Sequence, residues 1–296
     1  MVSLAAVSAG CGRYSGISAS LNQGEVDQLR KSLGEGAAAK VETVAAADPT
    51  GFATITGKFT LEGTPPAQVP LSVNKDMDVC MPGGKPVLSE QLVIDSKGGI
   101  KDVVIFCITK MPVGDPKWEH PDYAAAKANK LVFDQKQCVF LTHLVAARTG
   151  QTLVLTNSDP VGHNTNIVAK GKALSANVSI ASNGNSEYVV NGESAEPFDV
   201  SCAIHPWMSA KMITRDNPLF AVTKADGSFE IKNVPTGVPL EFKVWQESSK
   251  FIQSVKLNGA AAKWPKGKLS LKDKDVLKPG ETRKLDVTVD VSMFGK

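Results

Sequence analysis

Three side chains that could bind a metal lie close together in this chain of 296 residues. Cys202, His205 and Met208 are three residues apart and form a C-x2-H-x2-M run just after a strand-like segment. A thiolate, an imidazole and a thioether on one short loop combine soft and borderline donors, and this combination suits copper better than other common metals. Because such ligands serve both Cu(I) and Cu(II), the run predicts a site for single-electron exchange.

A fourth ligand is expected from a separate polar turn. The turn, Asn-Ser-Asp-Pro-Val-Gly-His-Asn, follows an alternating apolar segment and has His163 near its end. His163, Cys202 and His205 would form a trigonal set, with Met208 as the weak axial ligand. The next residue, Asn164, is expected to hydrogen-bond the Cys202 loop and to hold the two segments together.

These motifs resemble those of the cupredoxins, the small blue-copper electron carriers. The Gly-His-Asn turn resembles the first-histidine turn of plastocyanin and amicyanin, and the C-x2-H-x2-M spacing is similar to the tight amicyanin loop. The resemblance covers residues 130–215 and implies a Greek-key β-sandwich that binds one copper ion. It also implies a redox protein as partner, such as a dehydrogenase or a cytochrome.

Other metal chemistries fit the sequence less well. A C-x2-H pair could be half of a zinc site, but the chain has no C-x2-C motif or second Cys/His pair to complete it. Of the four histidines, His120 and His143 are isolated, one in a polar run and one at a strand start where a structural role is expected. Copper enzymes of this family need further histidine-rich centres, so we expect a protein that is not an enzyme.

Composition limits the remaining function classes. The chain is 42% hydrophobic and 21% charged, which is ordinary for a soluble globular protein, and its length permits two domains. A net charge of +3 is too small to indicate a nucleic-acid partner. We find no apolar run approaching the 18 or more residues of a membrane-spanning helix.

The first fifty residues predict export. Small residues before Cys11 resemble a bacterial lipoprotein cleavage site, although Ser8 departs from the usual pattern and a positive n-region is missing. We expect residues 1–50 to hold a remnant of the export signal and a disordered tether, with Cys11 lipidated as a membrane anchor; a chance match is the alternative. The expected location is the periplasm or the cell surface.

The pattern from residue 51 onward is all-β and predicts a second sandwich. Residues 52–61 alternate, and residues 101–109 form a nearly continuous apolar run suited to a central strand. Asp226-Gly227 between two alternating runs predicts a hairpin. The surrounding pattern, T-x-x-D-G-x-F-x-I-x-x-V-P-x-G, resembles the carboxypeptidase regulatory-like (transthyretin-like) domain.

The domain organisation follows from the two resemblances. Residues 51–112 together with 216–296 would form one discontinuous immunoglobulin/transthyretin-like β-sandwich. Residues 113–130 would be a linker, and residues 131–215 would be the inserted cupredoxin domain. Three domains in series are the alternative.

The five cysteines differ in their surroundings. Cys202 is assigned to copper and Cys11 to lipid. Cys107 lies in an apolar strand, where a buried free thiol behaves as a small hydrophobic group. Cys80 and Cys138 lie at polar turns and are the expected disulfide, which fits an exported protein. The sequence leaves pairing through Cys107 open.

The resemblance also implies a docking surface for the redox partner. In cupredoxins the C-terminal histidine ligand exposes one ring edge, and His205 has that position. The apolar Pro206 and Trp207, together with Val161 and Gly162 of the first-histidine turn, would form a small exposed patch beside it. Its expected rim consists of the basic residues Lys170, Lys172, Lys211 and Arg215. Packing of Trp207 into the end of the sandwich is the alternative.

Three functions are therefore compared. The leading one is an exported mononuclear type 1 copper protein that carries single electrons. The second is a structural or adhesive lipoprotein of the cell surface, although all four donors are present. The third is copper buffering or delivery, which favours clustered methionines, and the seven methionines of this chain do not cluster.

Overall fold

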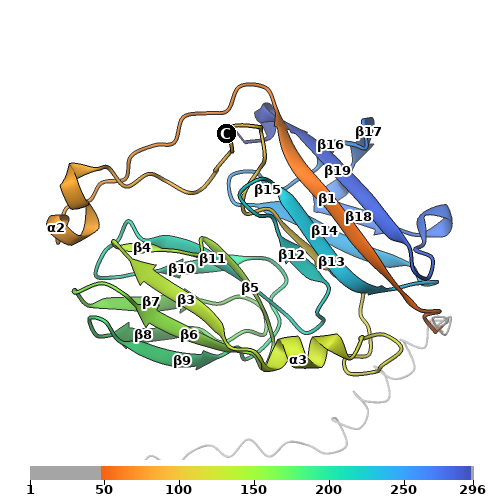
Figure 1. The fold of residues 1–296 in the computed structure, drawn as a ribbon, viewed down its shortest axis with the longest axis horizontal. Coiled ribbons are helices and arrows are strands. Elements are labelled where there is room, and N and C mark those ends of the chain that lie inside the picture. Colours follow the sequence, from red (N-terminus) through yellow and green to blue (C-terminus); the bar gives the residue numbers. More distant parts are fainter. Residues whose placement is uncertain (1–47, 295–296) are drawn as a thin grey trace, which may run out of the picture. The chain divides into compact units, whose positions relative to one another are not determined.

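The computed structural model describes residues 48–294, which are organised almost entirely as β-strands (Figure 1). The all-β prediction is therefore confirmed. The expected lipidation site Cys11 and nearly all of the expected tether lie outside the described residues. Within residues 48–294 we find no helix that combines the length and the apolar composition needed to cross a membrane.

The inner sandwich is built from consecutive strands. One sheet has the order β5-β11-β10-β7-β8 and the other β4-β3-β6-β9. Every second residue of β6 is buried, so its alternating sequence places one face in the core. The strands are β3 (Leu131–Lys136), β4 (Val139–Phe140), β5 (Leu144–Arg148), β6 (Thr152–Asn157), β7 (His163–Val168), β8 (Ala176–Ile180), β9 (Asn185–Val189), β10 (Phe198–Ser201) and β11 (Ser209–Arg215).

The outer sandwich takes strands from both sides of the inner one in the sequence. Its sheets have the orders β13-β1-β19-β16-β17 and β12-β2-β14-β15, and β18 also pairs with β14. The strands are β1 (Phe52–Glu62), β2 (Val104–Cys107), β12 (Phe220–Val222), β13 (Ser228–Pro235), β14 (Leu240–Gln246), β15 (Lys250–Phe251), β16 (Ser254–Leu257), β17 (Ala260–Lys263), β18 (Lys268–Leu271) and β19 (Thr282–Asp290). Short 3-10 turns are η2 (Pro265–Gly267), η3 (Asp273–Asp275) and η4 (Val291–Met293).

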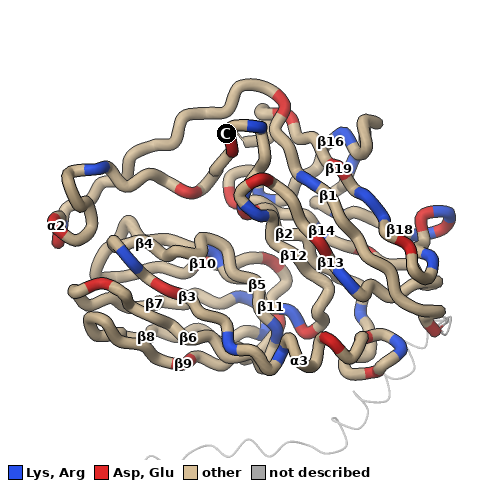
Figure 2. Tube along the Cα trace, in the orientation of Figure 1, with Lys and Arg blue, Asp and Glu red and all other residues tan. Residues whose placement is uncertain are grey.

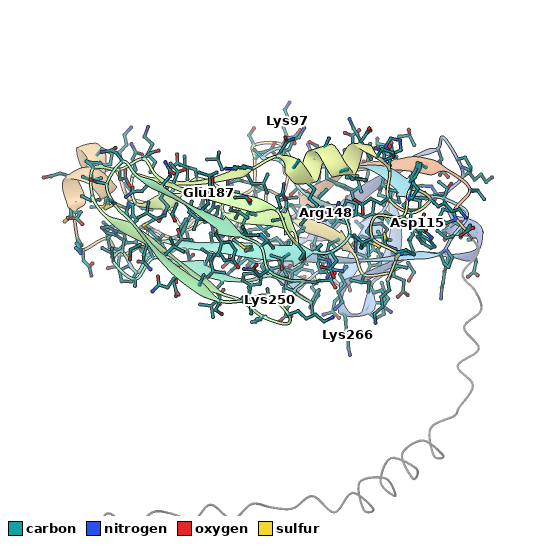
Figure 3. The ribbon with its side chains drawn as sticks, turned by 90° about the horizontal axis from the view of Figure 1, so that it is seen from below. Lys97, Asp115, Arg148, Glu187, Lys250 and Lys266 are labelled. Carbon is teal, nitrogen blue, oxygen red and sulfur yellow. A yellow bond between two sulfur atoms is a disulfide. The ribbon has the colours of Figure 1, made fainter. Side chains whose placement is uncertain are left out.

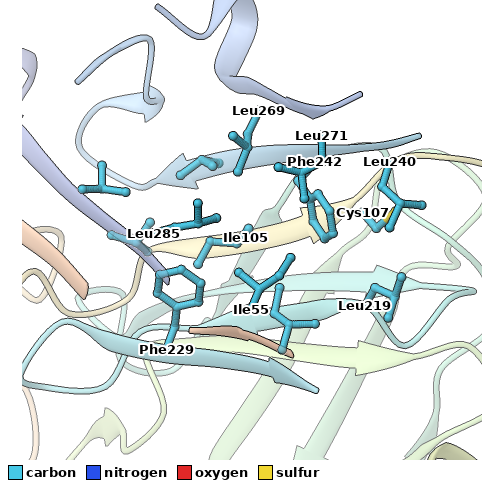
Figure 4. Close-up of a cluster of buried hydrophobic side chains, with 14 of the residues drawn as sticks. Ile55, Ile105, Cys107, Leu219, Phe229, Leu240, Phe242, Leu269, Leu271 and Leu285 are labelled. Carbon is cyan, nitrogen blue, oxygen red and sulfur yellow. The ribbon is translucent and has the colours of Figure 1, made fainter. Parts of the chain in front are cut away.

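Aliphatic and aromatic side chains fill the space between the two outer sheets. Ile55 from β1, Ile105 from β2 and Phe242 from β14 meet there, as the close-up shows (Figure 4). The continuous apolar run around Ile105 is fully buried in a central strand, as its sequence predicted. Cys107 is a buried free thiol in the same core.

The expected hairpin at Asp226-Gly227 is only partly correct. A turn is present, with the Gly227 N–H donating to the Lys224 carbonyl, and Gly227 has a φ of +81°. The strands on either side do not pair, however: β12 pairs with β2, whereas β13 pairs with β1. The Phe59 N–H donates to the Gly227 carbonyl, and a Cβ on Gly227 would lie 2.2 Å from the Phe59 carbonyl oxygen. The turn therefore packs against β1 and does not join two paired strands as a hairpin would.

A long arm, residues 63–99, leaves the outer sandwich between β1 and β2 and carries α2 (Met77–Cys80) and η1 (Pro82–Gly84). The arm runs out and back on itself, because Pro70 bridges to Leu88 in antiparallel fashion. In Figure 1 the arm is drawn in orange, with α2 beside the end of the inner sandwich where β4 lies. A disulfide between Cys80 and Cys138 ties α2 to the inner sandwich.

The segment expected as a linker is packed against both sandwiches. Trp118 is buried in the outer core, and α3 (Asp122–Ala128) follows it. The guanidinium of Arg148, which is labelled in Figure 3, donates two hydrogen bonds to the Glu119 carboxylate, at 2.6 and 3.1 Å. Charges of both signs also gather where β5 and β11 approach α3 (Figure 2). This segment is therefore fixed by a buried aromatic ring and a bidentate ion pair.

Candidate metal centre

The candidate metal centre lies at one end of the inner sandwich, between β7, β10 and β11. β7 begins at His163, and the antiparallel pairing of β7 with β10 places this end of β7 beside the end of β10 at Ser201. Cys202 follows β10 directly, and the loop that leads to β11 contains His205 and Met208. Two segments forty residues apart in sequence therefore meet because of strand pairing.

Three donor atoms converge in the interior. The Nδ1 atoms of His163 and His205 are 2.9 Å apart, and the Cys202 Sγ lies 3.9 and 4.0 Å from them. All three residues are at most 1% exposed. With metal–nitrogen bonds of about 2 Å and a metal–sulfur bond of about 2.3 Å, one ion reaches nitrogens up to about 4 Å apart and a nitrogen–sulfur pair up to about 4.3 Å apart. The donor set therefore fits a single bound ion.

The loop that carries these residues is closed by its own backbone. The Met208 N–H donates to the His205 carbonyl at 2.9 Å, and the Cys202 N–H donates to the Met208 carbonyl at 3.3 Å. Met208 is 1% exposed and belongs to the same core cluster as Cys202. The thioether is therefore kept in the interior next to the loop, and its role as axial ligand stays a prediction.

Asn164 joins the two segments. Its Oδ1 accepts hydrogen bonds from the Ala203 and Ile204 N–H groups, at 2.8 and 3.4 Å, and lies 3.3 Å from the Cys202 sulfur. Its own N–H donates to that sulfur at 3.5 Å. Asn177 accepts a hydrogen bond from the Asn164 amide at 2.7 Å and fixes its orientation. These are the contacts expected of Asn164 from the sequence.

The surroundings favour the thiolate form of Cys202. Burial raises the pKa of this thiol, but hydrogen bonds with His163, with the Asn164 N–H and with the His205 residue outweigh burial. Together they lower the pKa to about 6. Burial lowers the pKa of His163, but its hydrogen bonds with Cys202 and Asp159 outweigh burial and raise it. Since the thiolate is the form that binds a metal, the site is prepared for a soft ion.

Two carboxylates complete the site, and the sequence analysis missed both. Asp159, 2% exposed, has its Oδ2 2.8 Å from the His163 Nε2. Asp76, on the arm, has its Oδ2 2.8 Å from the His205 Nε2. Each imidazole thus donates from Nε2 to a carboxylate, which leaves Nδ1 directed at the common centre. The position of Asp159 in the same polar turn, four residues before His163, was a usable signal; nothing near Asp76 in sequence indicated its role.

The expected docking surface is wrong in its main feature. His205 is completely buried instead of exposing a ring edge, because the arm brings Asp76 against its Nε2. Trp207 is half-buried, its Nε1 donates to the Cys138 carbonyl at 3.2 Å, and its ring packs edge-on against His205. Within the expected patch, Pro206 and Gly162 are exposed, whereas Trp207 and Val161 are half-buried.

Two of the expected rim cations are also engaged internally. The Lys211 ammonium lies 3.0 Å from the Glu247 carboxylate and also pairs with Asp199. The Arg215 guanidinium is buried and donates to the Ser194 and Cys107 carbonyls, at 2.8 and 2.7 Å. Both side chains therefore serve the fold and not an exposed basic rim.

Comparison with known proteins gives partial matches to solved structures of copper proteins. The search of solved structures finds a copper-containing nitrite reductase (NirK) from Thermus scotoductus SA-01, with 11% identity and a TM-score of 0.27, covering 29% of this chain and 22% of that one. It also finds a reduced Cu(I) form of an amicyanin point mutant, with 19% identity and a TM-score of 0.26, covering 37% of this chain and 97% of amicyanin. The chain spans less than a quarter of the nitrite reductase.

Both matches are cupredoxin structures, and each covers only part of this chain. No protein-family model matches the chain. The search of curated proteins finds no match either.

Proposed function

We propose that this protein is a mononuclear type 1 copper protein that carries single electrons between redox proteins. The observation that carries the proposal is the buried triangle formed by two imidazole Nδ1 atoms and the Cys202 sulfur. Two imidazoles, one thiolate and a nearby thioether form the donor set of blue-copper electron-transfer sites. Copper bound there would supply one-electron exchange between Cu(I) and Cu(II).

The residues of the chain have separate roles in this proposal. His163, Cys202 and His205 would hold the ion, and Met208 would be the weak axial ligand. Asn164 fixes the distance between the two ligand-bearing segments through its hydrogen bonds to Ala203 and to the sulfur. Because the ligands are held by a β-sandwich and a short closed loop, they move little when the charge on the site changes. This rigidity is what a one-electron carrier requires.

Export and organisation belong to the same proposal. We propose a location in the periplasm or on the cell surface, and the Cys80–Cys138 disulfide supports it because disulfides persist in oxidising compartments. Lipidation of Cys11 would anchor the protein to a membrane. Residues 131–215 would be the copper domain, inserted into a carboxypeptidase regulatory-like sandwich formed by the sequence on either side.

Titration of the metal-free protein with Cu(II) tests the proposed function. We expect one equivalent to bind with a strong blue absorption, which arises from Cys202 thiolate-to-copper charge transfer and bleaches on mild reduction. Cys202→Ser should lose the colour even if the imidazoles retain some copper. Cys107→Ser, which removes the buried free thiol of the outer sandwich, is the matched control and should stay blue. A colourless wild-type protein that is fully loaded with Cu(II) would refute the proposal.

One observation favours a second function, copper buffering or delivery. The arm covers His205, and burial of both imidazoles limits direct contact of a redox partner with a ligand edge. Electron self-exchange and copper transfer to a competing chelator separate the two functions. An electron carrier should exchange electrons quickly and release copper slowly, whereas a delivery protein should show the reverse.

A further inference from the structure

The buried disulfide belongs to a closed ring of contacts that includes both imidazoles of the metal centre. The Cys80 and Cys138 sulfurs lie within 4.8 Å of a ring nitrogen of His205. The Cys138 sulfur is equally close to the candidate ligand atoms of Asp159 and His163. A disulfide that merely fastened the arm could lie anywhere along it, yet this one lies against both histidines and their partners.

The Cys138 half of the disulfide holds the carboxylate of Asp159. Gln137 and Cys138 form the turn between β3 and β4, and both have left-handed backbones, with φ of +52° and +55°. Their N–H groups donate to the two Asp159 oxygens, at 2.6 and 2.8 Å. Successive N–H groups in such a turn form a concave binding site for an anion. The oxygen bonded to Cys138 is the one that accepts from the His163 Nε2.

The Cys80 half of the disulfide holds the carboxylate of Asp76. Asp76 is the residue before α2 and also has a left-handed backbone, with φ of +47°. Its carbonyl accepts hydrogen bonds from the Val79 and Cys80 N–H groups, at 3.0 and 2.9 Å. The disulfide therefore fixes the one-turn helix whose first carboxylate contacts the His205 Nε2.

This arrangement selects one tautomer of each imidazole. A histidine binds a metal through the ring nitrogen that carries no proton. When the other ring nitrogen donates a hydrogen bond, the proton is held there and the first nitrogen is left to bind the metal. Here a carboxylate accepts from Nε2 in both rings, so the proton stays on Nε2 and Nδ1 is free to face Cys202. A carboxylate in this position also makes the imidazole a stronger donor.

We propose that Asp76, Asp159 and the Cys80–Cys138 disulfide form one positioning unit, which holds both imidazoles with Nδ1 directed at the metal. This inference rests on the proposed copper function and adds residues to it that touch no metal themselves. Its consequence is that the oxidation state of the disulfide controls how firmly the site holds copper. Reduction by a dithiol would convert the disulfide to two thiols, with oxidation of the dithiol, and would release α2 and Asp76 from the site.

The first test replaces each carboxylate and measures copper loss to an excess of chelator. Asp159→Asn and Asp76→Asn should each speed copper loss by about 10- to 100-fold, which is the usual effect of removing a partner of a metal-bound histidine. Asp159→Asn should have the larger effect, because Asp159 is almost completely buried whereas the Asp76 side chain is 32% exposed. Asp78→Asn, an exposed carboxylate on the same short helix, is the matched control and should stay within twofold of wild type.

The second test removes the disulfide. The double variant Cys80→Ser/Cys138→Ser should lose copper at least about tenfold faster than wild type, again by the effect of losing the histidine partners. Cys107→Ser is the control for removing a buried cysteine. If the disulfide contributed only to the stability of the fold, its removal would lower the melting temperature but leave the rate of copper loss from the folded protein unchanged. That result would overturn the proposal.

A third measurement needs no stable cysteine variant. The buried His143, whose Nε2 contacts Glu247, should give one protected Nε2–H proton in nitrogen-15 and proton spectra of histidine-labelled protein loaded with Cu(I). Two more should come from His163 and His205. Asp76→Asn should lose one of them and Asp159→Asn the other, while Asp78→Asn should keep both. If wild type turns blue but the carboxylate variants change neither spectra nor copper loss, the positioning unit is refuted and the copper function stands. A colourless wild type would refute both.

Discussion

Two buried histidine clusters lie on either side of the start of β11, and they look alike at first. In the metal centre, the His163 Nε2 lies 2.8 Å from the Asp159 carboxylate. In the second cluster, which joins the inner and outer sandwiches, the His143 Nε2 lies 2.5 Å from the Glu247 carboxylate. His163, His143, Asp159 and Glu247 are all buried.

The two clusters differ at the other ring nitrogen. The His163 Nδ1 faces a second imidazole and the Cys202 sulfur, whereas the His143 Nδ1 faces the Glu90 carboxylate at 3.9 Å. Lys211 adds a cation beside Glu247. A buried histidine with a carboxylate partner is therefore not by itself a metal ligand. A soft donor facing the free nitrogen makes the first cluster a candidate site, and the second is a structural ion-pair network.

Removing one histidine from each cluster should give the largest contrast. We expect His163→Gln to abolish the blue absorption and to weaken copper binding by more than about 100-fold, since a lost ligand costs more than a lost partner of a ligand. His143→Gln should leave both within about twofold of wild type. Copper titration followed by absorption measures both variants. Equal losses would mean that the comparison between the clusters is wrong.

The opposite contrast is expected for stability. Glu247→Ala leaves His143 and Lys211 without their buried partner, and breaking a buried ion pair in this way costs about 3–5 kcal/mol of unfolding free energy. Glu187→Ala breaks an exposed pair with Lys130 and should cost at most about 1 kcal/mol (Figure 3). Urea unfolding measures both. Glu247→Ala should nevertheless turn blue with copper, provided that it is assayed below its unfolding midpoint.

Acid should weaken the ion-pair cluster through Glu247. Burial raises the pKa of this carboxyl, but His143 and Lys211 outweigh burial and lower it below the ordinary value. The stabilisation from Glu247 is therefore complete above its unfolded pKa of about 4.3 and is lost as the pH falls through the lower folded pKa.

The same acid effect should be absent from a neutral variant. Glu247→Gln should be less stable than wild type at neutral pH, and the difference should shrink below about pH 4. Urea unfolding at a series of pH values checks this. Asp102 acts in the opposite direction, because burial raises its pKa and its protonation in acid therefore stabilises the fold. Asp102→Asn removes this offset, so the variant should lose more stability than wild type as the pH falls. A constant difference at all pH values would contradict the assignment to Glu247.

The smallest expected effect concerns the axial position of the metal centre. Met208→Leu should keep the blue colour but raise the reduction potential, because loss of a weak donor disfavours Cu(II) more than Cu(I). Cyclic voltammetry of the two proteins measures the shift. An unchanged potential would exclude Met208 as axial ligand and point to Met212, which is buried in the same core.

Much of the candidate metal centre was accessible from the sequence because the expected ligands lie on two short motifs. His163 and Asn164 follow one strand-like run, and Cys202 and His205 follow another, so pairing of neighbouring strands was enough to expect their meeting. The Cys80–Cys138 bond was accessible from the polar turns around its cysteines. These features depend on local sequence alone.

The features that local sequence missed depend on the path of the arm. Asp76 lies 129 residues before His205, and its approach follows from where residues 63–99 cross the inner sandwich. The same crossing buries His205 completely, which made the expected docking surface wrong. Likewise, Asp226-Gly227 indicated a turn correctly but gave no sign that its two strands join different sheets. Long-range placement, which one sequence does not specify, decided each of these cases.

The parallel pairing of β1 with β19 has a consequence for the order of assembly. This ladder joins Thr54–Glu62 to Thr282–Asp290, so residues as far apart as 228 positions must meet. Contacts of such long sequence separation form slowly, because the chain must first close a large loop. Every residue of the metal centre, including the arm and its disulfide, precedes β11. The centre can therefore assemble during synthesis while the first outer sheet still lacks β19. Folding of the inner sandwich then shortens the loop that the last pairing has to close.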